Sequence, residues 1–138
     1  MAVKEIWINL PVKDVAKSKE FFTTLGFTLN IQNGNTENSA CFLIGSKNVV
    51  LMLFSESQFK SFSRNELTDT TKSSEVLLSF DAESRQEVDE LARKAVTAGG
   101  ILFGEPTEVQ GWMYGCGFQD LDGHRWNVLF MDKNKIVK

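Results

Sequence analysis

The sequence has few of the residues that build metal centres, catalytic dyads and disulfide frameworks. Its 138 residues include one histidine, His124, and two cysteines, Cys41 and Cys116. Two isolated cysteines far apart form neither a disulfide framework nor a zinc knuckle. We expect two reduced, partly buried thiols, with no neighbouring base or cation to activate them. No Ser-His-Asp or Cys-His arrangement is visible, and a single histidine does not by itself establish acid–base catalysis.

The chain also lacks long apolar runs and clusters of positive charge. Its net charge is −3 and its lysines are dispersed, so we expect no nucleic-acid partner. No apolar run approaches the roughly 20 residues of a membrane-spanning helix, so we expect no membrane partner. The start, MAVKEIWINL, has no long apolar segment or small-residue cleavage site, as a signal peptide would. These features predict a cytoplasmic protein.

What is present is an ordinary globular composition, with 42% hydrophobic and 24% charged residues. The length suits one domain with a substantial core. In EIWINLPV, Ile6, Ile8 and Leu10 alternate with Trp7 and Asn9, which predicts a strand with both faces in use.

A helix is predicted next, over residues 15–25. Asp14 stands where an N-cap belongs, and Gly26 where a left-handed C-cap would end the helix. Val15, Phe22 and Leu25 recur at helical spacing. Glycines mark turns between three short strands that we expect near residues 28–31, 40–44 and 49–54.

A polar stretch over residues 55–74 reads as a connector, with Phe59, Phe62 and Leu67 as anchors. The same order of elements then begins again. A strand is expected in VLLSF, a capping box at Ser84–Glu87, and an apolar helical stripe after it. Three further strands are expected, within residues 101–103, 113–120 and 126–131. The fold class is therefore α+β, with two tandem βαβββ modules over residues 4–54 and 75–132.

Each helix must cover one face of its sheet, so the other face of each strand stays open. In the second module, Glu75 and Ser79 are expected on the open face of one strand, and Arg125 and Asn127 on the open face of another. Two such mixed faces curled towards each other would enclose a cavity with a few polar groups, as small-molecule sites do.

Two runs of residues near the ends of the chain are distinctive. The first has the pattern V-x-D-x-x-x-S-x-x-F-[YF]-x-x-L-G-F, with Val12, Asp14, Ser18, Phe21, Phe22, Leu25, Gly26 and Phe27. The second, at residues 120–127, reads DLDGHRWN. Both runs resemble those of the vicinal oxygen chelate superfamily, which includes glyoxalase I, extradiol dioxygenases, and fosfomycin and bleomycin resistance proteins. The closing run of that superfamily is D-P-D-G-[HN]-x-[WI]-E, so here Leu121 replaces the proline and Asn127 the glutamate. The resemblance implies one glyoxalase-like domain over residues 1–138, a curved mixed sheet around a cavity.

The resemblance also implies where a divalent metal would be bound. Its first ligand position holds Trp7, its second lies in residues 49–54, which contain no carboxylate or imidazole, and its fourth holds Asn127. Glu75 falls at or next to the third. An indole N–H cannot bind a metal, and an amide oxygen is a weak ligand. We therefore predict no metal ion and no cofactor, which removes the Lewis acid of the glyoxalase and dioxygenase mechanisms.

The candidate ligand-binding residues have alternative interpretations. Trp7 could stack on a flat ligand or fill a pocket closed by loss of the metal. Asn9 and Asn127 could bind a ligand, or satisfy each other or backbone groups. Arg125 could pair with Glu75 or an anionic ligand, or lie solvated at a rim.

Trp112 and Tyr114 lie in GWMYGCG, a glycine-interleaved aromatic run. It could be a mobile flap with both aromatics as ligand contacts, or a strand edge with packed aromatics. Glycines weaken a strand unless something approaches closely, which favours the flap. His124 follows the glycine of DLDGH, which most simply forms a tight turn, so its side chain is expected outside the cavity.

The first hypothesis is a metal-independent, small-molecule-binding homodimer, similar to bleomycin resistance proteins, with a flat aromatic ligand in the cavity between the modules. The second is a metal-dependent glyoxalase-like lyase or dioxygenase with relocated ligands, including Glu75 and His124. Metal content after purification without chelator distinguishes the two. A third possibility, an activity without metal, is neither supported nor excluded by the sequence.

Overall fold

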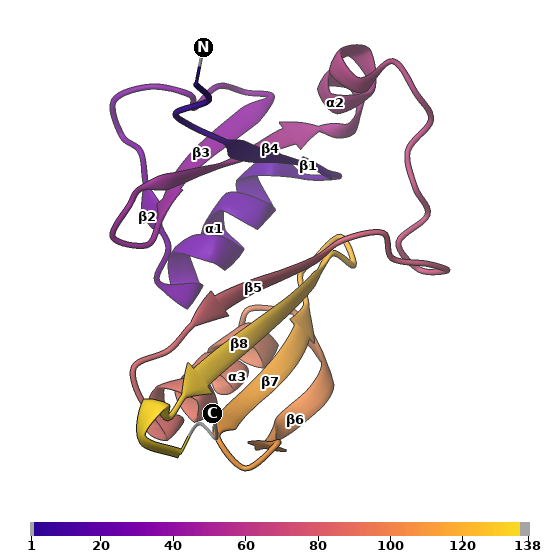
Figure 1. The fold of residues 1–138 in the computed structure, drawn as a ribbon. Helices are drawn as coiled ribbons and strands as arrows, with labels where there is room; N and C mark the ends of the chain where they lie inside the picture. Colours follow the sequence, from indigo (N-terminus) through magenta and orange to yellow (C-terminus); the bar gives the residue numbers. More distant parts are fainter. Residues whose placement is uncertain (1, 136–138) are drawn as a thin grey trace. The chain divides into compact units, whose positions relative to one another are not determined.

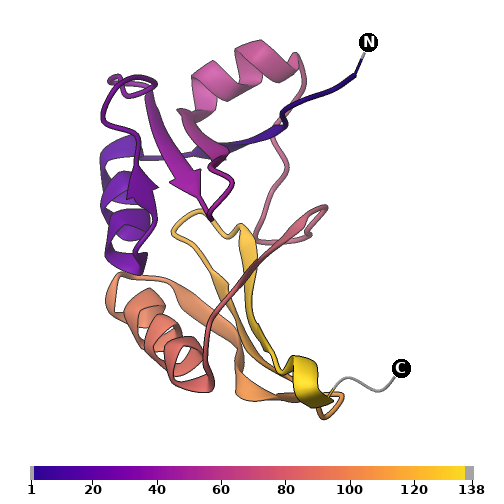
Figure 2. The same ribbon diagram turned by 60° about the vertical axis from the view of Figure 1, so that its left-hand side comes forward.

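The computed structural model describes residues 2–135, which form three α-helices and two four-stranded mixed sheets (Figures 1 and 2). This confirms the predicted α+β class. The chain divides into two compact units, the first ending at Thr68 and the second beginning at Asp69. No helix within residues 2–135 combines the length and apolar character needed to cross a membrane.

The first unit has the order β-α-β-β-β that the sequence predicts, followed by a further helix. Its sheet has the strand order β1-β4-β3-β2, with β1 parallel to β4 and the other pairs antiparallel. The elements are β1 (Trp7–Val12), α1 (Val15–Leu25), β2 (Thr28–Leu29), β3 (Ser39–Ile44) and β4 (Val49–Ser55).

Helix α1 begins and ends where the sequence indicates, and it covers one face of this sheet (Figure 1). The Asp14 carboxylate accepts the Lys17 backbone N–H at 3.0 Å, and Gly26 has a φ of 103°, which favours glycine. The helix buries Phe21, Phe22 and Leu25. Sheet residues that are also buried complete this core: Leu10, Val12, Ala40, Phe42, Leu51 and Leu53.

The start of the predicted connector is a helix, α2 (Glu56–Ser63). The Ser55 side chain accepts the Gln58 backbone N–H, and the Phe62 ring meets the Phe54 ring edge-to-face at 5.2 Å between centroids. The sequence contains a local signal for the start of this helix. SESQ, at residues 55–58, matches the S-x-x-E/Q capping pattern.

The second unit repeats the order, with a sheet arranged β5-β8-β7-β6 in which only β5 and β8 are parallel. Strand β6 extends well beyond its predicted three residues. The elements are β5 (Leu77–Asp81), α3 (Arg85–Thr97), β6 (Ile101–Val109), β7 (Met113–Gln119), β8 (Arg125–Met131) and the 3-10 helix η1 (Lys133–Lys135).

Helix α3 covers one face of this second sheet (Figure 1). The Ser84 hydroxyl accepts the Glu87 backbone N–H at 3.1 Å, as the capping signal predicts. The predicted apolar stripe is buried, at Val88, Leu91, Ala92 and Ala95. Opposite it, the rings of Phe118 and Trp126 stack with centroids 6.3 Å apart.

The DLDGH segment forms the predicted tight turn, which lies between β7 and β8. The side chain of Asp120 holds this turn together through hydrogen bonds. This carboxylate is only 5% exposed. One oxygen accepts the backbone N–H groups of Asp122 and His124 at 2.9 and 3.0 Å, and the other accepts the Trp126 indole N–H at 3.1 Å. Burial raises the pKa of Asp120, and the nearby His124 opposes that shift.

Cys41 and Cys116 are both free and buried, more deeply than the partial burial that the sequence led us to expect. Burial, reinforced by the charges of Asp89 and Glu105, raises the pKa of Cys116 to about 11. The thiolate is the reactive form of cysteine, so this thiol is poorly suited to nucleophilic chemistry near neutral pH.

Candidate functional site

Each sheet has one face that its own α1 or α3 helix does not cover. We call the face of β1, β4 and β3 that points away from α1 the first face, and the face of the β5-β8-β7-β6 sheet that points away from α3 the second face. Residues in register on neighbouring strands point to the same side of a sheet. Register therefore decides which predicted site residues lie together.

The first face contains Trp7 and Asn9, as the alternation predicts. Their register partners on β4 are Val50 and Met52. The Trp7 side chain is 55% exposed and Asn9 is also exposed. Within residues 2–135 the side-chain amide of Asn9 forms no hydrogen bond. Its two N–H donors and its carbonyl oxygen are therefore available to a ligand, on a face whose other side chains are mainly apolar.

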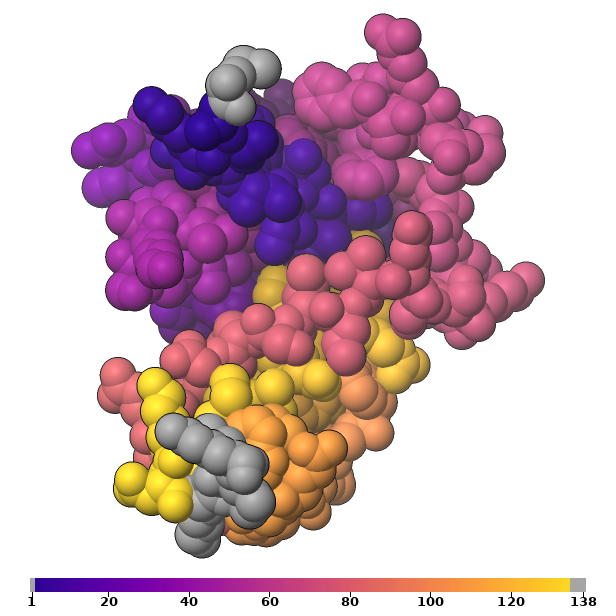
Figure 3. All heavy atoms as spheres, in the orientation of Figure 1, coloured from indigo at the N-terminus to yellow at the C-terminus, as the bar shows by residue number. Residues whose placement is uncertain are grey.

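The second face brings together Ser79, Arg125 and Asn127. Ser79 and Asn127 are register partners, and Arg125 is the register partner of Gln119 on β7. Within the described residues, the Ser79, Gln119 and Asn127 side chains have no hydrogen bond and Arg125 has no ion pair. We call Ser79, Gln119, Arg125 and Asn127 the polar cluster. Atoms of the β5 and β8 segments reach the surface in the space-filling view (Figure 3).

Phe103 holds the arginine of this cluster in place. The guanidinium carbon of Arg125 lies 4.5 Å from the centre of the Phe103 ring, within cation–π range. The ring itself lies over Gly117, because a Cβ at that position would be only 2.4 Å from Phe103 Cε1. Sequence reasoning missed Phe103, although glycine within a strand is a sign of close approach.

A second close approach occurs at Gly115, where a Cβ would lie 2.6 Å from Leu129 Cδ2. The glycines of GWMYGCG are thus explained by packing inside this unit. The flap interpretation is not supported, because residues 113–119 form β7, paired on both sides. Trp112 is half-buried in the hairpin turn before β7, and its carbonyl accepts the Asp132 backbone N–H at 2.8 Å.

Tyr114 lies on the α3 side of the sheet, away from the second face. Its hydroxyl donates a 2.7 Å hydrogen bond to the Asp89 carboxylate, and Arg85 lies 4.9 Å from its ring centre. The hydrogen bond to Asp89 is the main cause that raises the pKa of Tyr114, and burial adds to it. The packed-aromatic interpretation therefore holds for Tyr114.

Glu75 lies outside the strand in which we expected it. It is exposed and precedes β5, which begins at Leu77. Among the described residues, the structure records no ion pair between Glu75 and Arg125. The second face therefore unites three of the predicted residues, Ser79, Arg125 and Asn127, while Glu75 lies apart from its strands.

Three of the four positions implied for metal ligands offer no good ligand for a divalent ion, and Glu75, at or next to the third, is the exception. Trp7 offers an indole N–H, and the residues of β4 that share its face are Val50, Met52 and Phe54. Asn127 offers one amide oxygen, a weak ligand. Across residues 2–135, no three His, Cys, Asp or Glu side chains are grouped so that they could hold a metal ion.

The family model described as "Bleomycin resistance protein-like N-terminal" matches residues 4–45. No curated protein sequence is similar enough to the chain to count as a relative. The hypothetical protein SA1046 from S. aureus, a solved structure, is 34% identical, with a TM-score of 0.83 over 94% of this chain and 95% of that one.

More distant solved structures share the fold. A glyoxalase/bleomycin resistance protein/dioxygenase family enzyme from Burkholderia phytofirmans is 17% identical, with a TM-score of 0.76 over 91% of this chain and 96% of that one. The fosfomycin resistance protein FosX from Listeria monocytogenes is 21% identical, with a TM-score of 0.67 over 97% of this chain and 98% of that one. At these identities the likeness concerns the fold alone.

Proposed function

Because the chain belongs to the vicinal oxygen chelate superfamily, we propose that it is a metal-independent small-molecule-binding protein whose ligand lies against the sheet faces that α1 and α3 do not cover. The observation that carries this proposal is the polar cluster on the second face. There, Arg125 lies over the Phe103 ring, and Ser79 and Asn127 are register partners whose side chains form no hydrogen bond among the described residues. A few placed polar groups among apolar side chains are what a small-molecule site offers.

The chemistry of the faces suggests the class of ligand. A guanidinium with adjacent amide and hydroxyl donors suits a carboxylate or another anionic acceptor group. Phe103 on the second face and Trp7 on the first face present aromatic rings that are 41% and 55% exposed, and flat ligands stack on such rings. We therefore propose an aromatic ligand that carries an anionic group.

Isothermal titration calorimetry with 2-naphthoate tests this proposal on protein kept in a chelator such as EDTA. The wild type should bind, and Arg125→Gln should weaken binding about tenfold, because a hydrogen bond to a charged group contributes about 1.5–3 kcal/mol. Arg64→Gln is the matched control, since Arg64 ends α2 in the first unit. Binding that needs added zinc, nickel, iron or manganese, or equal loss in both variants, would overturn the proposal.

Three further statements stay predictions: that one cavity between the modules holds the ligand, that the protein is a homodimer, and that it is cytoplasmic. If one cavity holds the ligand, substitutions on the first face and on the second face should both lower the affinity for the same ligand. The second requires a sedimentation-equilibrium mass of twice 15.5 kDa, and a mass of 15.5 kDa at micromolar concentration would contradict it.

A further inference from the structure

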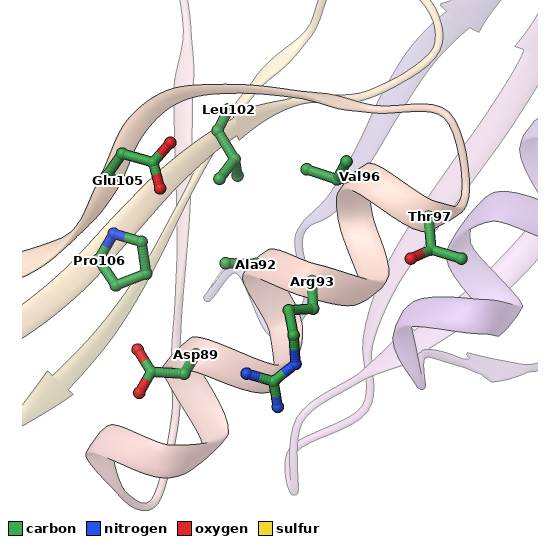
Figure 4. A pocket seen from close by; sticks show the side chains of 8 residues that line it. All are labelled: Asp89, Ala92, Arg93, Val96, Thr97, Leu102, Glu105 and Pro106. Atoms are coloured by element: carbon green, nitrogen blue, oxygen red, sulfur yellow. The ribbon is translucent and has the colours of Figure 1, made fainter.

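The second unit has a groove on the opposite side of its sheet from the polar cluster, between α3 and β6. Its volume is about 440 Å³, and Figure 4 shows the side chains that line it. Ala92, Val96, Leu102 and Pro106 make its apolar part. The groove is open and is not used by the function proposed above.

Two irregularities in β6 shape this groove. Gly104 pairs with Gly117 and Thr107 pairs with Gly115, so Glu105 and Pro106 together lie opposite the single residue Cys116. Two residues opposite one form a β-bulge, which bends a strand and redirects its side chains. The bulge puts Glu105 and Pro106 on the groove, and Cys116 faces α3, with its Sγ 4.0 Å from the Val88 carbonyl.

Two carboxylates lie at one end of the groove. Asp89 and Glu105 lie on either side of Pro106, whereas Val96 and Thr97 lie towards the other end (Figure 4). Both carboxylates raise the pKa of Cys116 through their charge, which agrees with their closeness to this point of the sheet. The Tyr114 hydroxyl fixes one oxygen of Asp89 at 2.7 Å.

Within residues 2–135, arginines lie near these carboxylates without forming an ion pair with either of them. Among the described residues, neither Asp89 nor Glu105 has an ion pair with a lysine or arginine. Arg93 also lines the groove, but its guanidinium points away from β6 (Figure 4). The groove thus combines an apolar floor with two carboxylates at one end, neither of which has an ion pair in the part of the chain that the structure describes.

We propose that this groove binds a small organic cation, with its apolar body against Ala92, Leu102 and Pro106 and its ammonium group at the end of the groove that carries Asp89 and Glu105. The charge complementarity of the two carboxylates selects a cation over an anion. Arg93 opposes this cation at longer range. The groove and the polar cluster therefore take ligands of opposite charge on opposite sides of one sheet.

NMR titration of the full ¹⁵N-labelled chain with benzylammonium tests the proposal, with benzyl alcohol as the neutral analogue. Benzylammonium should shift amide signals in residues 89–97 and 102–107. Asp89→Asn and Glu105→Gln should each weaken its binding about threefold, as expected for exposed charge pairs. Arg93→Gln should strengthen it, because a repelling charge is removed.

Glu90→Gln is the matched control, since it removes the same charge from the same helix at a residue that does not line the groove. Its affinity for benzylammonium should equal that of the wild type. Equal binding of benzyl alcohol, or equal effects of Glu90→Gln and Glu105→Gln, would overturn the proposal. Weaker binding in Arg93→Gln would do so as well, because Arg93 would then hold an anionic group of the ligand.

Discussion

The guanidinium carbon of Arg125 lies 4.5 Å above the centre of the Phe103 ring. This pair joins β8 to the edge strand β6 across β7, where Gly117 leaves room for the ring. A cation and an aromatic surface are thereby held together on strands rather than on a loop. Such preorganisation lowers the entropy cost of ligand binding.

The first prediction concerns Gly117→Ala. The new Cβ would lie 2.4–2.5 Å from Phe103 ring atoms, so the ring must move and Arg125 loses its stacking partner. We expect 2-naphthoate to bind several-fold more weakly, and the free energy of unfolding to fall by about 1 kcal/mol because a flexible side chain can yield. Calorimetry and urea denaturation measure the two effects.

The loss of stability in Gly117→Ala should be compared with that in Gly115→Ala. There the Cβ would lie 2.7 Å from the Val128 carbonyl oxygen, which is backbone and cannot move without disturbing the β7–β8 pairing. We expect a loss of about 3 kcal/mol, at the upper end of the range for overpacking. A smaller loss of stability in Gly115→Ala than in Gly117→Ala would contradict this reading of the two glycines.

The second prediction concerns Asp120, the buried carboxylate of the turn before β8. Asp120→Asn replaces an acceptor oxygen with an amide donor, so one of three N–H groups loses its partner. We expect the free energy of unfolding to fall by about 1–3 kcal/mol. Urea denaturation of the variant and the wild type gives this difference.

The Asp120 effect should depend on pH in a defined direction. Burial raises the folded-state pKa of this carboxyl above 3.8, so the folded protein binds its proton more tightly than the unfolded chain does. That contribution to stability is present at low pH and is lost as the pH rises through the raised pKa. The deficit of Asp120→Asn should therefore shrink between about pH 4 and neutrality, and a deficit that grows with pH would refute the assignment.

The third prediction separates Tyr114 from the binding face. Tyr114→Phe removes the hydrogen bond to Asp89 and should lower the free energy of unfolding by about 0.5–1.5 kcal/mol. Because Tyr114 lies on the α3 side of the sheet, 2-naphthoate affinity should not change. A several-fold loss of that affinity would return Tyr114 to the site.

The ionisation of Tyr114 offers an independent check. It is the one tyrosine in the sequence, so an ultraviolet pH titration reports on it alone. The hydrogen bond to Asp89 raises its pKa above 10.0, and Asp89→Asn should move the midpoint back towards 10.0. An unchanged midpoint would mean that Asp89 is not the cause.

The fourth prediction concerns Trp7 on the first face. Its side chain is 55% exposed, so Trp7→Ala should change the free energy of unfolding by about 0.5 kcal/mol or less. Stacking with a ligand ring contributes about 0.5–1.5 kcal/mol, which corresponds to a two- to twelvefold loss of 2-naphthoate affinity. Unchanged affinity would confine binding to the second face.

Local patterns were sufficient to predict much of the fold. Asp14 and Gly26 mark the ends of α1 because capping depends on residues within one turn. Alternation also predicted the two faces of β8 correctly, with Asn127 on one face and Val128 on the other. Helix α2 also had a capping signal, but its polar serines outweighed it in our interpretation.

The candidate site was harder to predict because it depends on register between strands. The stacking of Arg125 on Phe103 requires an irregular pairing of β6 with β7, and nothing near residue 103 in the sequence specifies it. Tyr114 was misjudged for a related reason. The glycines around it indicated close approach correctly, but the approaching groups, Leu129 and Phe103, belong to the same unit rather than to a ligand.

The central claim is that the second face binds an anionic aromatic ligand without a metal ion. The most direct test is an NMR titration of ¹⁵N-labelled protein with 2-naphthoate in the presence of EDTA. The predicted result is saturable shifts concentrated in β5 and β8, with a midpoint at about tenfold higher ligand concentration in Arg125→Gln. Shifts that appear only after a divalent metal is added, or that are confined to α3 and β6, would contradict it.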